Sequence, residues 1–208
     1  MPSSASVSAA PSRGRPRDEH TDEAILAATL RLLRDAGYRS LSVEAVAGEA
    51  GVAKTTVYRR YRNKADLATA ALATMIPVDE LAHPSDDPQR DLVSFLDEFE
   101  TALEDVGVDV IGSLLIDRGD SEFVELHRER IIGPRKQRSR QLLRRAQKLG
   151  LIRPDADLDL VMEMLIGSFF ARHLAGRERP PRWAENAVAT LWKGLEIRDS
   201  GSPRKLGE

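Results

Sequence analysis

Apolar residues recur at the three- and four-residue spacing of a helix along most of the chain, and no stretch alternates convincingly enough to be a strand. Early acids, apolar positions such as Ile25 and Leu32, and Gly37 as a stop predict the first helix over 18–36. A short second helix is predicted over 43–50. The pattern therefore predicts an all-α protein.

Capping and turn residues divide the chain into further helices. Ser42 can cap the helix over 43–50, and Gly51 ends it. Asn63 can cap a longer helix that stops near Pro77, with Asp66 as its capping-box-like partner. Helices are also expected at 53–61, 88–105, 107–117, 120–149 with a kink at Pro134, 155–175 and 180–196.

The composition fits a soluble, helix-rich protein, with 41% hydrophobic, 31% charged and 5% aromatic residues. The absence of cysteine excludes disulfides, thiolate nucleophiles and Cys-ligated zinc. The N-terminal residues MPSSASVSAAPSRG do not resemble a secretory signal, and the most apolar stretch, 160–171, is shorter than the ~20 residues of a membrane span. We therefore expect a cytoplasmic protein.

Charge is distributed unevenly along the chain. Residues 11–64 hold 11 Lys plus Arg against 7 Asp plus Glu, a balance of +4. Because the whole chain carries -2, residues 65–208 carry -6. A basic front part joined to an acidic remainder suggests a module that faces a polyanion.

The stretch GVAKTTVYRRYRNKADL beginning at Gly51 has the spacing of a helix-turn-helix motif. Ala47 is small where a second helix crosses closely, Gly51 suits a tight turn, and Val52 and Val57 supply apolar packing. Small residues at the start of the second helix let the backbone approach base edges, and basic and phenolic groups reach phosphates. The predicted outer face carries Lys54, Thr55, Thr56, Tyr58, Arg59 and Arg60.

The longer run GYRSLSVEAVAGEAGVAKTTVYRRYRNKADL resembles the DNA-binding domain of the TetR family of transcriptional regulators. The resemblance covers residues 20–72 and implies an all-helical homodimer with an N-terminal helix-turn-helix and a larger C-terminal effector domain. Two residues depart from the family pattern: Gly48 lies inside the short second helix, and Tyr61 stands where Phe or Trp is commoner.

The resemblance also implies roles for individual residues in DNA binding. Lys54 and Thr55 lie where the family touches bases, with Thr56 at the adjoining position. Ser42 caps the preceding helix against the DNA backbone, and Arg59 replaces a variable contact residue. The implied phosphate contacts are Tyr58, Arg60 and Lys64.

Two other basic segments have two interpretations each. The segment SRGRPR holds Arg13, Arg15 and Arg17 at alternate positions. Its RGRP, residues 13–16, matches the core of an AT-hook that would enter a minor groove, and equally suits a flexible solubilising tail. The run over 135–148 contains seven Lys or Arg and no acid. We interpret it as a solvated helix face rather than a second nucleic-acid surface.

The resemblance implies that the last two helices form a four-helix dimer interface with a partner copy. The predicted interface residues are Leu165, Gly167, Phe169, Phe170, Trp183, Ala187, Leu191 and Trp192. A pocket for a small lipophilic effector would then fall inside the middle bundle, although apolar residues at this spacing also suit a plain core. The candidate ligand residues are Phe95, Phe99, Leu103, Leu114, Phe123, Met162 and Ile166.

Enzyme and metal chemistry find little support. The sequence has no HExxH arrangement, no GxSxG elbow and no glycine-rich phosphate loop, so neither a metal nor a cofactor is expected. The predicted function is a ligand-responsive repressor released from a palindromic operator in double-stranded DNA. The alternative is a small-molecule-binding or catalytic helical bundle without DNA function.

The predicted organisation has four parts. They are a disordered basic arm at 1–17, a helix-turn-helix DNA-binding domain at 18–64, a helical effector-binding and dimerisation domain at 65–196, and a frayed tail at 197–208.

Overall fold

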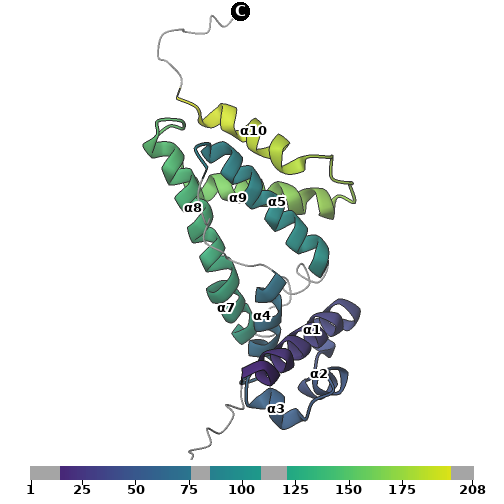
Figure 1. Cartoon of the computed structure of the whole chain (residues 1–208). Coiled ribbons are helices and arrows are strands. Elements are labelled where there is room, and N and C mark those ends of the chain that lie inside the picture. Colours follow the sequence, from purple (N-terminus) through teal and green to yellow (C-terminus); the bar gives the residue numbers. More distant parts are fainter. Residues whose placement is uncertain (1–14, 76–84, 109–120, 198–208) are drawn as a thin grey trace, which may run out of the picture.

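A computed structural model describes residues 15–75, 85–108 and 121–197, and within these ranges the regular structure is helical throughout (Figure 1). The first four helices are α1 (Arg15–Ser40), α2 (Val43–Glu49), α3 (Lys54–Tyr58) and α4 (Lys64–Met75). The later elements are α5 (Pro88–Val106), α7 (Ser121–His127), the π-helix η1 (Arg128–Ile132), α8 (Gly133–Lys148), α9 (Leu158–Leu174) and α10 (Trp183–Leu195). The all-α prediction is confirmed.

Helices α1, α2 and α3 form one end of the molecule, and α5, α8, α9 and α10 form the other (Figure 1). Helix α4 connects them, because it packs against α1 on one side and against α7 on the other. Its residues Leu67, Ala68, Ala71 and Leu72 are completely buried. The apolar core therefore runs without a break from the small helices into the bundle.

Most helix boundaries lie close to those predicted. Gly37 interrupts α1 as expected, with φ 72° and ψ 172°, values that glycine adopts far more readily than other residues. The cap of α4 also forms, because the Asp66 N–H donates to Asn63 Oδ1 at 2.9 Å. Helix α3 is shorter than predicted and ends at Tyr58, after which the N–H groups of Arg60 and Tyr61 both donate to the Val57 carbonyl in a turn. The helix expected at 107–117 falls largely outside the described residues.

The kink expected at Pro134 appears as a π-helical turn between α7 and α8. Proline has no N–H to donate, and its ring clashes with the carbonyl four residues back. The chain widens instead, and the Gly133 N–H donates to the carbonyl of Arg128, five residues earlier. Single π turns of this kind occur often at functional sites in helices.

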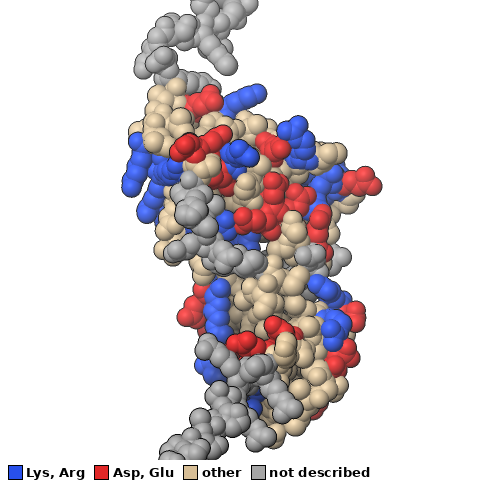
Figure 2. Space-filling view, in the orientation of Figure 1, with Lys and Arg blue, Asp and Glu red and all other residues tan. Residues whose placement is uncertain are grey.

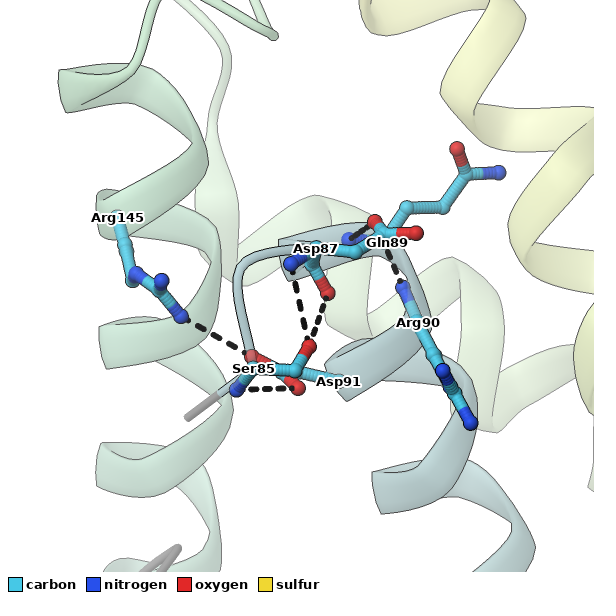
Figure 3. Close-up of polar contacts among 6 residues, drawn as sticks. All are labelled: Ser85, Asp87, Gln89, Arg90, Asp91 and Arg145. Atoms are coloured by element: carbon cyan, nitrogen blue, oxygen red, sulfur yellow. Dashed lines mark hydrogen bonds and ion pairs between the residues drawn. The ribbon is translucent and has the colours of Figure 1, made fainter. Parts of the chain in front are cut away.

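The start of α5 is fixed by a compact set of polar contacts (Figure 3). Asp87 caps the helix by accepting hydrogen bonds from the N–H groups of Gln89 and Arg90 at 3.0 and 3.2 Å. Asp91 accepts from the Ser85 N–H and from Arg145 of α8, both at 3.1 Å. Because Asp91 is buried, this pair locks the first turn of α5 onto α8.

Candidate nucleic-acid interface and effector cavity

Helices α2 and α3 meet at the turn that a helix-turn-helix requires. Ser42 caps α2 by accepting a hydrogen bond from the Ala45 N–H at 3.1 Å. Gly51 has φ 66°, and the Val52 N–H closes the turn by donating to the Ala47 carbonyl at 3.0 Å. The Val57 side chain is completely buried beneath the turn. Since Ala47 is also buried and small, α3 can cross close to α2.

One face of α3 is open to solvent. Lys54, Thr55, Tyr58 and Arg59 are exposed on it, and 48% of the Tyr58 surface is accessible. Lys54 pairs with Glu44 of α2 and lies 5.5 Å from the centre of the Tyr58 ring. The hydrogen bond between Lys54 and Glu44 lowers the pKa of Glu44 and raises the pKa of Lys54, so both side chains stay charged near neutral pH. Arg59 forms no ion pair with the described residues.

Two of the predicted phosphate contacts, Arg60 and Lys64, also bind groups within the chain. Arg60 points toward α1, where it pairs with Asp22 and donates to the Thr56 carbonyl at 3.4 Å, and only 12% of its side chain is exposed. Lys64 donates to the Arg39 carbonyl at 2.9 Å and lies 4.5 Å from the Tyr38 ring centre. Both cations hold the small domain together. Residue type alone does not reveal that these two cations have partners within the chain.

The structure describes the side chains of only some of the remaining predicted DNA contacts. Thr56 is half-buried, and the Ser42 hydroxyl serves as the cap of α2. Arg13 lies outside the described residues. Arg15 and Arg17 begin α1, so the helix starts earlier than the predicted arm allowed, and nothing is described of their side chains.

The junction between the two ends of the molecule contains a buried carboxylate. Asp66 at the start of α4 accepts from the Arg62 N–H at 2.9 Å and from Arg130 of η1 at 2.6 Å. Burial opposes ionisation of this carboxyl group, but the two hydrogen bonds and the nearby arginine charges together hold its pKa below the ordinary value of 3.8. The π-helical turn is thereby tied to the first turn of α4.

A cavity of about 460 Å³ opens between α5, α8 and α9. It is lined by four of the seven predicted ligand residues, which are Phe95, Phe99, Met162 and Ile166. Leu103 is buried in the core away from this lining. Phe123 instead lies at the junction, with its ring centre 4.4 Å from that of Tyr38. Leu114 lies outside the described residues.

Sequence reasoning missed Arg135 as a cavity residue. Its guanidinium lies 5.6 and 5.7 Å from the ring centres of Phe95 and Phe99. Burial lowers its pKa to about 10, so it remains protonated at neutral pH. Arg135 was already part of the basic run over 135–148, but the sequence does not show that this arginine, unlike others in the run, faces the cavity. The exposed cations of α8, including Arg140 and Arg144, match the solvated face predicted for that run, and basic and acidic side chains are interspersed in this part of the molecule (Figure 2).

The predicted dimer-interface residues differ in how far they are buried within the single chain. Leu165, Phe169, Trp183 and Trp192 are buried within the single chain, where the Phe169 and Trp183 ring centres lie 5.4 Å apart. They pack in the core of the protomer, which leaves little of their surface open to a partner copy. Phe170, Ala187 and Leu191 are half-buried, and Gly167 is exposed. The solvent-facing apolar stripe of α9 consists of Leu160, Met164, Gly167, Ala171 and Leu174.

No group of His, Asp and Glu side chains among the described residues is arranged to hold a metal ion. None of the helices described is both long and apolar enough to cross a membrane.

The two-helix motif, its exposed α3 face and the helical bundle behind it define a helix-turn-helix DNA-binding regulator. Family models agree: the model for bacterial regulatory proteins of the tetR family matches residues 25–71, and that for the tetracyclin repressor-like C-terminal domain matches residues 83–191. The chain belongs to the TetR family of DNA-binding transcriptional regulators.

Individual proteins show the same likeness. The HTH-type transcriptional regulator YdeS of Bacillus subtilis is 29% identical over 190 residues, which cover 88% of this chain and 94% of YdeS. The DNA-binding transcriptional repressor TetR of Mycobacteroides abscessus is 46% identical over 56 residues, covering 27% of this chain and 30% of that protein.

Solved structures extend the likeness to the fold. The TetR family regulator SCO0332 superposes with a TM-score of 0.62 and 26% identity, over 85% of this chain and 98% of its own. A TetR transcriptional regulator from Agrobacterium tumefaciens gives a TM-score of 0.66 at 21% identity, over 84% and 94% of the two chains.

Proposed function

We propose that this protein is a homodimeric repressor that binds a palindromic operator through α3 and leaves it when a small lipophilic molecule enters the cavity. The observation that carries the proposal is the open face of α3, where Lys54, Thr55, Tyr58 and Arg59 lie together. A short helix with small residues at its start can enter a major groove and reach base edges.

The chemistry of these side chains suggests a division of labour. Lys54 and Thr55 at the start of α3 are placed for base edges, whereas Tyr58 and Arg59, one turn later, are placed for phosphates. Lys54 must leave Glu44 to do so, and DNA phosphates would compensate for the lost pair. Arg13, and Arg15 and Arg17 at the start of α1, would add minor-groove or phosphate contacts.

The proposed dimer is supported by the solvent-facing apolar stripe of α9. Its five residues are spaced by four, three, four and three positions, the repeat that two packed helices share. Leu160, Met164 and Leu174 are 46, 51 and 80% exposed, so a partner copy would bury substantial apolar surface. A two-fold dimer presents two α3 helices, and these match a two-fold operator when they lie about one DNA turn apart.

The proposed ligand response would pass through η1 and α4. Ile132 and Arg135 line the cavity, and Arg130, two residues before Ile132, holds Asp66 at the start of α4. A ligand that moves the first turn of α8 would displace α4 and alter the separation of the two α3 helices, as a two-state coupling. An inducer that saturates the protein yet leaves this separation unchanged would disprove the mechanism.

Fluorescence anisotropy with labelled DNA from upstream of the gene tests the DNA role. Wild-type protein should bind tightly in the presence of competitor DNA, and affinity should fall steeply between about 50 and 200 mM salt. Tyr58→Ala and Lys54→Ala should abolish specific binding. Arg144→Ala removes an exposed cation of α8 and is the control for net charge, with an expected affinity close to wild type.

Equal binding by wild type and both α3 variants would contradict the assignment of α3 as the reading element. Binding that hardly responds to salt would favour the alternative of a bundle without DNA function.

A further inference from the structure

Apolar side chains make up much of the wall of the cavity between α5, α8 and α9. Phe95 and Phe99 come from α5, Ile132 from the end of η1, and Met162 and Ile166 from α9. The volume of about 460 Å³ lies within the ~300–1,000 Å³ range of small-molecule sites. An apolar wall of this kind suits the hydrocarbon part of a ligand.

The cavity also holds a cation that lacks an ionic partner. Arg135 forms no hydrogen bond and no ion pair with the residues that the structure describes, and its guanidinium lies over the rings of Phe95 and Phe99. Ring faces attract a guanidinium, but its N–H donors meet no hydrogen-bond acceptor among the described residues and are left to solvent or to a ligand. Arg135 therefore keeps its full capacity to bind an anion.

The nearby carboxylates are engaged elsewhere or turned to water. Glu98 accepts two hydrogen bonds from Arg138, at 2.7 and 3.1 Å. Asp159 lies 3.5 Å from Lys136 and 3.6 Å from Arg140. Glu163 lines the cavity but is exposed and forms no ion pair with Arg135. None of the three forms an ion pair with Arg135, although the charge of nearby Glu98 favours its protonated form.

A partly buried charge without a partner is costly, and a ligand anion would relieve that cost. The guanidinium stays charged at neutral pH, because burial brings its pKa no lower than about 10. Its planar fork matches the two oxygens of a carboxylate, which can accept two parallel hydrogen bonds.

We propose that the cavity binds an amphipathic carboxylate, whose head group pairs with Arg135 while its aliphatic chain lies against Phe95, Phe99 and Ile166. The inference rests on the proposed function in taking this cavity as the effector site, and it adds the chemical class of the ligand. It also accounts for a guanidinium without an ion-pair partner beside the phenylalanine rings of the cavity.

Isothermal titration calorimetry of the full chain with three ten-carbon probes tests the head group. Decanoate, decanol and decyltrimethylammonium have the same tail and differ in charge, and each is used below the concentration at which it forms micelles. Decanoate should bind at least about tenfold more tightly than decanol, as expected for hydrogen bonds to a charged group. The cationic probe should bind more weakly than both.

Variants then locate the contact. Arg135→Gln should weaken decanoate binding about tenfold or more and leave decanol unchanged, whereas Arg135→Lys, which keeps the charge but loses the fork, should fall between. Arg144→Gln on the exposed face of α8 is the matched control and should behave as wild type. Ile166→Trp should weaken decanoate and decanol alike by filling the cavity.

Three results would overturn the proposal: equal affinity of wild type for decanoate and decanol, full decanoate affinity in Arg135→Gln, or no binding of any probe. The first and third comparisons use wild-type protein only, so they stand even where a variant folds poorly. DNA anisotropy on the same samples separates this proposal from the proposed function. Arg135-dependent decanoate binding that releases no DNA would establish the carboxylate site and contradict release through this cavity.

Discussion

The α3 surface and the cavity differ in how the chain builds them. The exposed α3 face comes from residues within one short helix, Lys54–Tyr58, and the arginine that follows it. The cavity takes its lining from α5, η1, α8 and α9, with Phe95 and Gly167 at the two ends of the sequence span. Neighbours in sequence become neighbours on the DNA-facing surface, whereas the cavity exists only when distant helices pack.

Pairs of arginines that are close in sequence also show how packing with distant residues determines the role of a side chain. Arg59 and Arg60 are adjacent, yet one is exposed and the other is anchored to Asp22. Arg135 and Arg138 are one turn apart, yet Arg138 is paired with Glu98 and Arg135 faces the cavity. Identical side chains therefore take opposite roles, and the partner that each one meets determines which.

The largest expected effect comes from breaking the element that both regions share. Leu67→Ala removes a completely buried side chain from α4, which packs against α1 and α7. It should lower the free energy of unfolding by about 2–5 kcal/mol, because it leaves a cavity in a shared core. Urea denaturation followed by circular dichroism measures this. Leu149→Ala, at an exposed leucine of 55% accessibility, is the control and should change stability by less than about 0.5 kcal/mol.

A second test concerns the polar link between the two regions. Asp66→Asn should cost about 1–3 kcal/mol at neutral pH, since it removes the charge that receives hydrogen bonds from Arg62 and Arg130. The folded pKa of Asp66 lies below its ordinary value of 3.8, so its contribution is fully present above that pH.

The stability difference between wild type and Asp66→Asn should therefore be constant above about pH 5 and shrink as the pH falls through the lowered pKa. Denaturation midpoints collected from pH 7 down to pH 3 measure it. A difference that grows on acidification would show that the sign of the linkage is wrong.

Adjacent arginines provide the third test. Arg59→Ala should weaken operator binding and reduce the slope of log affinity against log salt by about one, with stability unchanged. Arg60→Ala should instead lower stability by up to about 1 kcal/mol through loss of the partly exposed Asp22 pair. Anisotropy at several salt concentrations and urea denaturation measure the two effects. Equal salt slopes in both variants would mean that Arg60 also reaches a phosphate.

The smallest expected effect concerns Glu44. Glu44→Gln frees Lys54 from its exposed ion pair and removes a negative charge beside α3. DNA affinity should rise by less than about fivefold at low salt, and the gain should fade at high salt because the site is open to solvent. The gain should also appear with unrelated DNA sequences, since it is electrostatic. Weaker operator binding would show that the pair positions Lys54 for its base contact.

Much of the architecture was determined by local sequence. Helical spacing, the stops at Gly37 and Gly51, and the caps at Ser42 and Asn63 act within a few residues, so they predicted the helices and the turn of the motif. Pro134 likewise signalled a break, although the proline by itself did not predict that the break would be a π-helical turn. The α3 face belongs to the same class of local feature.

Only the tertiary structure decided which side chains remain exposed or unpaired and so can contact DNA or a ligand. It paired Arg60 and Lys64 with groups of the same chain, buried Leu165, Phe169, Trp183 and Trp192 in the protomer, and left Arg135 without an ionic partner among the described residues. Residue type and spacing fix what a side chain can do. Burial and pairing depend on atoms that are distant in the chain and meet only when the helices pack.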